Sequence, residues 1–92
     1  MLEKLIEKKL VKEVEKRKGL CLKLVCLGFF GMPDRMLLLP YGKIGFVEVK
    51  TPGKKPRTLQ LKRHEQLRKL GFKVYVLDTL EEIGGIVDEI SG

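Results

Sequence analysis

Three acidic residues of this 92-residue sequence occupy unusual positions for a negative charge. Glu48 lies inside an apolar strand pattern, Asp34 follows Gly-Met-Pro, and Glu7 borders the apolar stripe of a helical pattern. Lys50 shares the pleat face of Glu48, with the two side chains about 6–7 Å apart in a strand. Carboxylates in an apolar setting must pair or bind metal, and their hard oxygens suit Mg²⁺ or Mn²⁺. The cluster predicts a divalent-metal site with a cation beside it.

Each of these residues also has a plainer interpretation on its own. Glu48 and Lys50 could form a same-face ion pair on an exposed strand. Asp34 could be a turn residue after Pro33, and Glu7 could be a solvated acid of the helix. Their joint occurrence favours the metal site over three separate explanations.

The positive charge of the chain is concentrated in one segment. Lys and Arg number 19 against 12 Asp and Glu, which gives a net charge of +7. Residues 50–73 contain nine of these basic residues and one acidic residue, so the rest of the chain is nearly neutral. Such a basic field indicates a polyanionic partner, most simply nucleic acid, although solvated helix faces are also often basic.

Hydrophobic periodicity and turn residues divide the chain into helices and strands. Apolar residues three and four apart predict an amphipathic first helix, which Gly19 ends. Thr79 and Glu82 have the spacing of a capping box that opens a last helix. The expected elements are a helix at 2–17, strands at 20–27, 35–39 and 44–50, a helix at 58–70, a strand at 72–77 and a helix from 79 to about 90.

The order of these elements indicates how they assemble. Tight connections make the first three strands antiparallel, whereas the helix before the fourth strand is long enough for a parallel crossover. The predicted fold class is therefore α/β, a mixed four-stranded sheet flanked by helices, in a single domain over residues 1–92. No apolar run reaches about 18 residues, so no membrane span is expected.

Cys21 and Cys26 are the two cysteines of the chain. In a strand at 20–27 their Cα atoms lie about 16 Å apart and their side chains point to opposite faces. A disulfide needs Cα atoms within about 7 Å, and no His stands near enough in sequence to suggest a zinc site. Reduced thiols are expected, as is typical of cytoplasmic proteins.

On this element order, Pro33-Asp34 and Glu48-Val49-Lys50 resemble the PD-(D/E)xK nuclease superfamily. More narrowly, the chain resembles the VRR-NUC family, the virus-type replication-repair nucleases. The segments that carry this resemblance are Ile6-Glu7, Gly31-Met32-Pro33-Asp34-Arg35, Phe46-Val47-Glu48-Val49-Lys50, Leu59-Gln60, Leu67, Leu70-Gly71-Phe72 and Val74-Tyr75-Val76-Leu77-Asp78. They cover nearly the whole chain. Family members often have Ser-Pro before the Leu-Gln pair, where this chain has Arg57-Thr58.

The resemblance implies an αβββαβ(α) core and metal-dependent hydrolysis of DNA phosphodiesters. Lys50 would orient or activate the attacking water, and Gln60 would contact Lys50 or a water in the site. The implied ligands of one or two Mg²⁺ or Mn²⁺ ions are Asp34, Glu48, the carbonyl of Val49 and, directly or through water, Glu7. The residues expected to bind DNA are Arg35, Lys54, Lys55, Arg57, Lys62 and Arg63.

Three further side chains have more than one interpretation. His64 follows Gln60 by one helical turn and is expected to be structural or DNA-facing rather than a general base. Phe29 and Phe30 precede the site and are expected in the core or an interface rather than wedged between bases.

The resemblance further implies a structure-specific DNA endonuclease that acts on branched DNA, such as a four-way (Holliday) junction, since small members of the family are similar to junction-resolving nucleases of phages and bacteria. A symmetric homodimer would place two equivalent sites for two equal cuts. The apolar residues expected to supply its interface are Phe29, Phe30, Met32, Met36 and Leu37-Leu38-Leu39, or else the first helix. The expected setting is the cytoplasm of a bacterial cell or phage-infected host.

Two other classes of protein fit the composition. One is a non-catalytic nucleic-acid-binding module on the same scaffold, and the other is a basic structural protein of the ribosome or nucleoid. The first would be free to lose the site residues, and the second has no need of carboxylates inside an apolar strand. Because Glu7, Asp34, Glu48 and Lys50 are all present, the enzyme is favoured.

Overall fold

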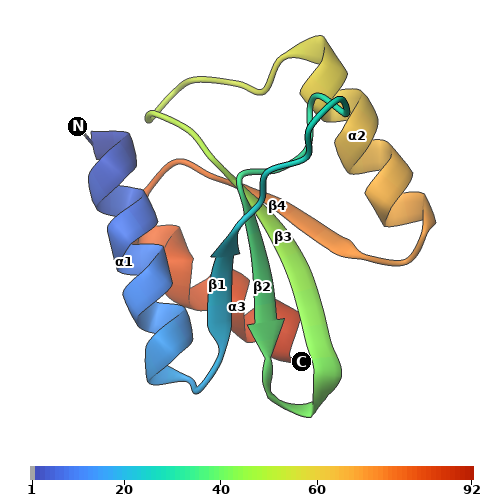
Figure 1. Cartoon of the computed structure of the whole chain (residues 1–92). Helices are drawn as coiled ribbons and strands as arrows, with labels where there is room; N and C mark the ends of the chain where they lie inside the picture. Colours follow the sequence, from blue (N-terminus) through green and yellow to red (C-terminus); the bar gives the residue numbers. More distant parts are fainter. Residues whose placement is uncertain (1) are drawn as a thin grey trace.

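The first helix of the molecule forms where the sequence is amphipathic. The computed structural model describes residues 2–92 (Figure 1). In the first helix, Ile6, Leu10 and Val14 lie three to four residues apart and are buried on one face. The helices are α1 (Leu2–Lys16), α2 (Thr58–Lys69) and α3 (Ile83–Ser91), with single 3₁₀ turns at Pro40–Gly42 and Leu80–Glu82. None of them is long and apolar enough to cross a membrane.

Four strands form one mixed sheet in the order β1-β2-β3-β4, which is also their order along the chain. The strands are β1 (Leu20–Lys23), β2 (Arg35–Leu39), β3 (Lys43–Val49) and β4 (Lys73–Leu77). The first three are antiparallel neighbours, with Met36 opposite Phe46, and β4 runs parallel to β3, with Glu48 beside Val76. The predicted fold class and strand directions are confirmed.

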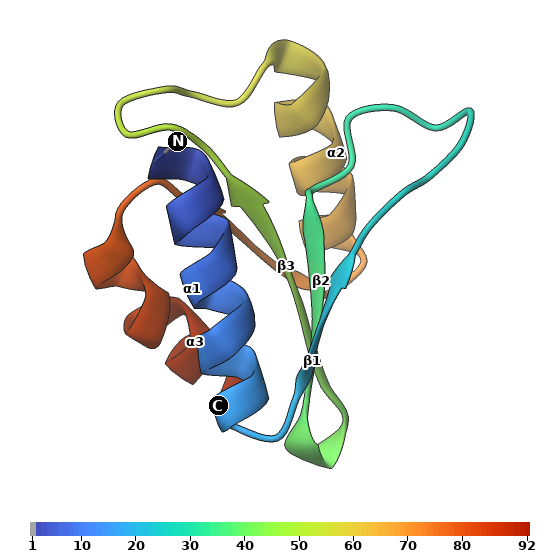
Figure 2. The same cartoon turned by 60° about the vertical axis from the view of Figure 1, so that its left-hand side comes forward.

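Helices cover the two faces of this sheet unequally, with α1 and α3 on one face and α2 on the other (Figures 1 and 2). The larger core lies under α1 and α3, where it includes Leu37 and Leu39 of β2. Burial of these two leucines corrects the expectation that they offer apolar surface to a partner. A smaller core under α2 contains Phe46, Leu67 and Val74. Residues of β3 therefore alternate between two covered faces.

The predicted strand at 20–27 is too long. The strand β1 ends at Lys23, and the Leu24 N–H donates to the Asp34 carbonyl at 2.8 Å before the chain leaves the sheet. Cys26 therefore lies in the loop that follows and not in the strand beside Cys21. Both cysteines are free thiols, as predicted.

The predicted capping box at Thr79 and Glu82 is also wrong. The Thr79 hydroxyl lies 3.1 Å from a Glu82 carboxylate oxygen, and it caps no backbone N–H. The two side chains hydrogen-bond each other instead of capping the backbone. The chain makes the 3₁₀ turn Leu80–Glu82 first, and α3 begins at Ile83. The other boundaries differ from the predicted ones by a residue or two.

Candidate active site

Glu48 lies in the interior of the sheet, with 1% of its surface exposed. Its strand β3 is paired on both sides, so each residue faces one of the two helical layers. Val47 and Val49 belong to the core under α1 and α3, whereas Phe46 and Glu48 face α2. The buried position excludes an ion pair on an exposed strand, and a carboxylate so enclosed requires partners.

Three side chains surround the Glu48 carboxylate. Its Oε2 accepts a hydrogen bond from Gln60 Nε2 at 2.8 Å and lies 3.3 Å from Lys50 Nζ. Its Oε1 lies 3.5 Å from His64 Nε2, without the alignment of a hydrogen bond. Within residues 2–92 this buried oxygen therefore accepts no hydrogen bond, although an acceptor in such a position nearly always has a partner.

The surroundings of Glu48 disfavour its charged form and make it a weaker acid. Burial, followed by the negative charge of Asp34, raises the pKa of Glu48 to about 7, despite the opposing charge of Lys50. Burial also raises the pKa of Asp34, assisted by the charge of Glu7. Both carboxylates thus ionise less readily than usual, and a cation that binds between them would stabilise their charged forms.

The loop before β2 brings Asp34 to the end of β3. Its Oδ2 accepts the Val49 N–H at 2.8 Å, which ties two segments 15 residues apart. Gly31 makes this route possible, because its φ is 91° and a Cβ there would lie 2.9 Å from Leu59 of α2. Pro33, which lies between Gly31 and Asp34 in the sequence, is buried. The Gly-Met-Pro-Asp segment is thus a backbone path that delivers a carboxylate beside Glu48.

Lys50 follows the last residue of β3 and extends the parallel ladder, since its N–H donates to the Leu77 carbonyl at 2.9 Å. Its side chain is half-buried and lines a hollow of about 360 Å³. The other residues around this cleft are Glu3, Thr51, Lys54, Lys55 and Arg57. Lys50 therefore connects the buried Glu48 carboxylate to an open, positively charged cleft.

Glu3 is a cleft residue that the sequence analysis missed. It accepts a hydrogen bond from the Thr51 hydroxyl at 3.2 Å, and its charge contributes to the raised pKa values of both Asp34 and Glu48. Its position one helical turn before Glu7 is the signal that could have revealed it.

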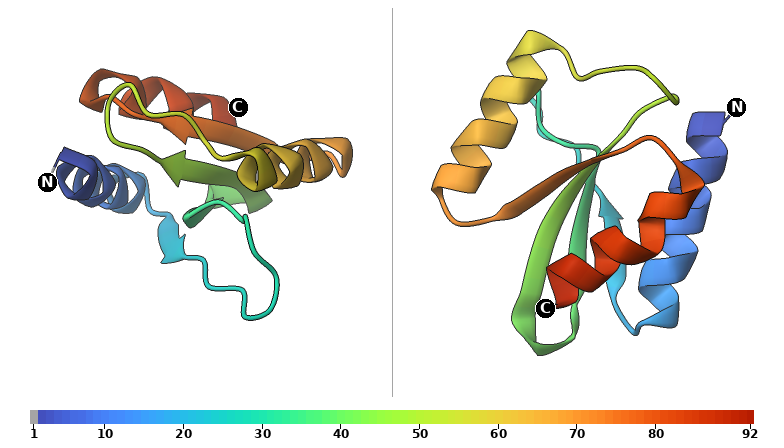
Figure 3. Two further views of the ribbon diagram at one scale, coloured as in Figure 1. Left: turned by 90° about the horizontal axis from the view of Figure 1, so that it is seen from above. Right: turned by 180° about the vertical axis from the view of Figure 1, so that it is seen from behind.

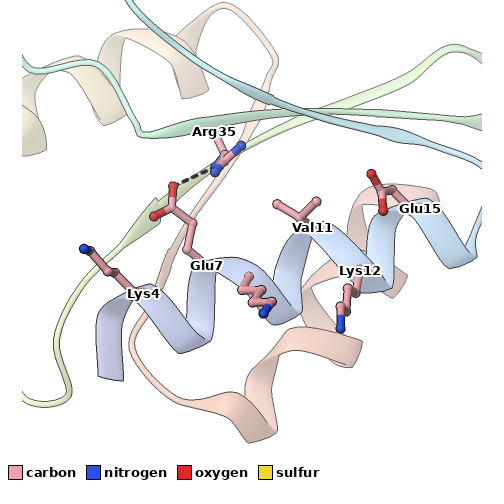
Figure 4. Close-up of a pocket in the computed structure, with 7 residues that line it drawn as sticks. Lys4, Glu7, Val11, Lys12, Glu15 and Arg35 are labelled. Atoms are coloured by element: carbon pink, nitrogen blue, oxygen red, sulfur yellow. Dashed lines mark hydrogen bonds and ion pairs between the residues drawn. The ribbon is translucent and has the colours of Figure 1, made fainter. Parts of the chain in front are cut away.

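Glu7 and Arg35 form an ion pair of 2.8 Å between α1 and β2 (Figure 4). Arg35 also donates to the Cys21 carbonyl at 3.3 Å, so its guanidinium is engaged within the chain. The contact of Glu7 with a metal and that of Arg35 with DNA stay predictions. The pair joins the first helix to the strand that begins at the candidate site.

Gln60 contacts a different partner from the one expected. Sequence reasoning placed it against Lys50 or a water, but its amide nitrogen donates to Glu48. Its oxygen accepts the Arg57 N–H at 2.8 Å. Gln60 thus holds the Glu48 carboxylate with one end and the start of α2 with the other.

The basic residues expected to bind DNA divide into two groups. Lys54, Lys55 and Arg57 are exposed around the cleft, and Lys62 is exposed on α2. Arg63 instead donates to the Phe30 carbonyl at 2.8 Å and lies 3.9 Å above the Phe29 ring. Arg63 therefore fastens the loop between β1 and β2 onto α2.

His64 is fully buried, which excludes the DNA-facing alternative and leaves the structural one. Neither of its ring nitrogens has a hydrogen-bond partner within residues 2–92. Burial, then the charges of Arg68 and Lys50, lowers the pKa of His64, so the ring is neutral at pH 7. The sequence placed His64 one turn beyond Gln60, but its contact with Glu48 required the packing of α2 on the sheet.

The oxygen ligands at the site suit a hard divalent cation that keeps some of its bound water molecules. No three His, Cys, Asp or Glu side chains of residues 2–92 gather into a ready-made metal site. Asp34, Glu48 and the Val49 carbonyl nonetheless offer two carboxylates and a backbone oxygen, and Glu48 Oε1 lacks a partner. Mg²⁺ is usually held by one or two carboxylates, with waters and phosphate oxygens completing its octahedron.

Comparisons with known proteins agree with the fold. The chain is 46% identical over 86 residues to "Putative nuclease p44" of Acyrthosiphon pisum secondary endosymbiont phage 1, covering 94% of this chain and 91% of that protein. A solved structure described as a "VRR_NUC domain" superposes with a TM-score of 0.90 at 35% identity, covering 96% of both chains. The chain belongs to the VRR-NUC family. No protein-family model matches it.

Proposed function

We propose that this VRR-NUC protein is a divalent-metal-dependent endonuclease that hydrolyses phosphodiester bonds of DNA. The observation that carries the proposal is the buried Glu48 carboxylate, with one oxygen unpartnered, beside Asp34 and Lys50 at the edge of a basic cleft. The family name and the phage relative's name support the same class of activity.

Each residue of the site has a distinct task in this proposal. Asp34, Glu48 and the Val49 carbonyl hold Mg²⁺ or Mn²⁺, with Glu7 adding a contact directly or through water. When bound, the ion lowers the pKa of a water and offsets the charge that develops on the phosphate. Lys50 orients this water and places a positive charge near the scissile phosphate. Gln60 keeps the Glu48 carboxylate in place.

The basic cleft suits the sugar-phosphate backbone of DNA. Lys54, Lys55 and Arg57 are exposed there, and such cations bind phosphates without reading base sequence. We propose branched DNA, such as a four-way junction or a flap, as the preferred substrate and DNA repair or phage replication in a bacterial cytoplasm as the setting.

We also propose a homodimer, with an interface that differs from the one expected. Edge strand β1 and the loop after it project from one side of the molecule (Figure 3). They carry the exposed apolar side chains Leu20, Leu22, Val25, Leu27, Phe29 and Phe30. An apolar edge of this kind favours association with a second copy. Light scattering that gives a mass near 10.5 kDa at micromolar concentration would contradict the dimer but leave the nuclease proposal standing.

The direct test is a cleavage assay on labelled four-way junction, flap and linear duplex, each with Mg²⁺, Mn²⁺ or EDTA. We expect cleavage with either metal, none in EDTA, and faster cutting of branched DNA. Binding without cleavage under every condition would instead support the non-catalytic nucleic-acid-binding module.

A further inference from the structure

A second hollow, of about 430 Å³, lies against α1 and shares no lining residue with the basic cleft, although Glu7 borders it (Figure 4). Its positive residues are Lys4, Lys8 and Lys12 of α1 and Arg35 of β2. The three lysines recur every fourth residue and therefore lie on one face of the helix, about 6 Å apart along its axis. Together they form a row of positive charge about 12 Å long.

The charges in this row are largely uncompensated. Within residues 2–92, none of the three lysines lies within 4.0 Å of a carboxylate oxygen. Of the two acids that line the hollow, Glu7 is paired with Arg35, and Glu15 lies at the C-terminal end of the row. The N-terminal part of the hollow is thus free to attract an anion.

The row starts where the active-site cleft ends. Glu3, next to Lys4 in the chain, lines the cleft and accepts a hydrogen bond from Thr51. From this point α1 runs along one face of the sheet, whereas the basic loop 51–57 leads to α2 over the other (Figures 1 and 2). Two positively charged paths therefore leave the cleft in different directions.

We propose that Lys4, Lys8 and Lys12 bind the phosphate backbone of a second arm of a branched DNA substrate. This inference rests on the proposed nuclease function, since the first arm is the one held in the cleft. A row about 12 Å long spans about three phosphates of one strand at 3.4 Å per nucleotide. A straight duplex that follows the loop and α2 does not meet this row, because the row lies across the sheet from α2.

The test compares two double variants of α1 that remove equal charge from exposed positions. Lys8→Gln with Lys12→Gln removes two members of the row, and Lys9→Gln with Lys16→Gln removes two exposed lysines that do not line the hollow. Binding of both variants and the parent is measured in EDTA over a salt series, with a four-way junction and a linear duplex of the same arm sequence. Thermal unfolding and light scattering establish that both variants retain the parent's fold and mass.

We expect the row variant to bind the junction several-fold more weakly and to reduce its salt slope by about 1 to 2, at up to about 0.9 per lost phosphate contact. Linear-duplex binding should change no more than in the control variant. Equal losses in the two variants, or equal losses on junction and linear duplex, would overturn the second-arm proposal. A parent protein that binds neither DNA would overturn the proposed function as well.

Discussion

The polar cluster around Glu48 and the lysines around the cleft differ chiefly in their access to water. Glu48 and His64 are 1% and 0% exposed, whereas Lys54 and Lys55 are exposed. A buried charge interacts strongly with its neighbours and costs free energy when a partner is lost, whereas exposed charges are screened by salt and add little to stability. The residues proposed for the chemistry and those proposed for DNA binding therefore have different surroundings, so substitutions should separate the two activities.

The sharpest test of this separation neutralises the two carboxylates proposed to bind metal without changing their shape. Asp34→Asn and Glu48→Gln should each reduce cleavage below detection, because an amide oxygen cannot replace the charge that holds a divalent ion. DNA binding measured by gel shift in EDTA should persist, since the exposed cations remain. Glu81→Gln, at an exposed acid elsewhere, serves as control and should cut normally. Cleavage at the parent rate in either site variant would refute the assigned ligands.

Lys50 lies at the boundary between the two regions, and its loss should affect the reaction more than the binding of metal. Lys50→Ala should lower the cleavage rate about 10²–10³-fold, as expected when one charge that stabilises a transition state is removed. Calorimetry with Mg²⁺ at pH 8, where Glu48 is ionised, should still detect metal binding. Complete loss of that binding would instead make Lys50 a structural partner of Glu48.

Buried carboxylates should also make the metal-free protein sensitive to pH. Glu48 has a pKa near 4.5 when unfolded and about 7 when folded, so the folded state binds more protons between these values. Stability from this group is full below about pH 4.5 and falls as pH rises towards about 7, by up to about 3 kcal/mol.

The matched variant for this prediction is Glu48→Gln, which cannot titrate at that position. The stability of the parent relative to this variant should fall between pH 5 and pH 8 in EDTA, as measured by thermal unfolding. The raised pKa of Asp34 acts in the same direction, whereas the lowered pKa of His64 acts oppositely, so the difference between parent and variant reports Glu48 together with its effect on these two neighbours. Parallel stability curves would show that Glu48 ionises normally.

The smallest effects are expected at the exposed cations of the cleft. Replacing Lys54, Lys55 and Arg57 together by Ala should weaken binding to all DNA sequences alike and flatten the salt slope by up to about 0.9 per lost phosphate contact. Stability should change by no more than about 0.5 kcal/mol per residue. Lys9, Lys16 and Lys23, exposed away from the cleft, are the control set. An unchanged slope would show that the loop does not face DNA.

Local periodicity predicted most of the fold, because the apolar pattern of each segment agrees with its burial. The alternation in 44–50 placed Val47 and Val49 on one face and Glu48 on the other, as observed. The predicted strand at 20–27 is too long because the apolar run continues through Val25 to Leu27, although the chain leaves the sheet after the Leu24 N–H has donated to the Asp34 carbonyl. An apolar run indicates burial or β-propensity, but the length of a strand depends on how far a neighbouring strand pairs with it.

The sequence by itself determined the residue types and the approximate place of the candidate site, since Asp34, Glu48 and Lys50 lie at strand ends whose order can be predicted. Only the tertiary structure decided which partners they have. Gln60 and His64 reach Glu48 because α2 packs on the same face of the sheet, and Glu7 meets Arg35 because α1 lies on the opposite face. Such contacts join residues distant in the chain, and their distances and burial follow from how the layers pack rather than from any local pattern.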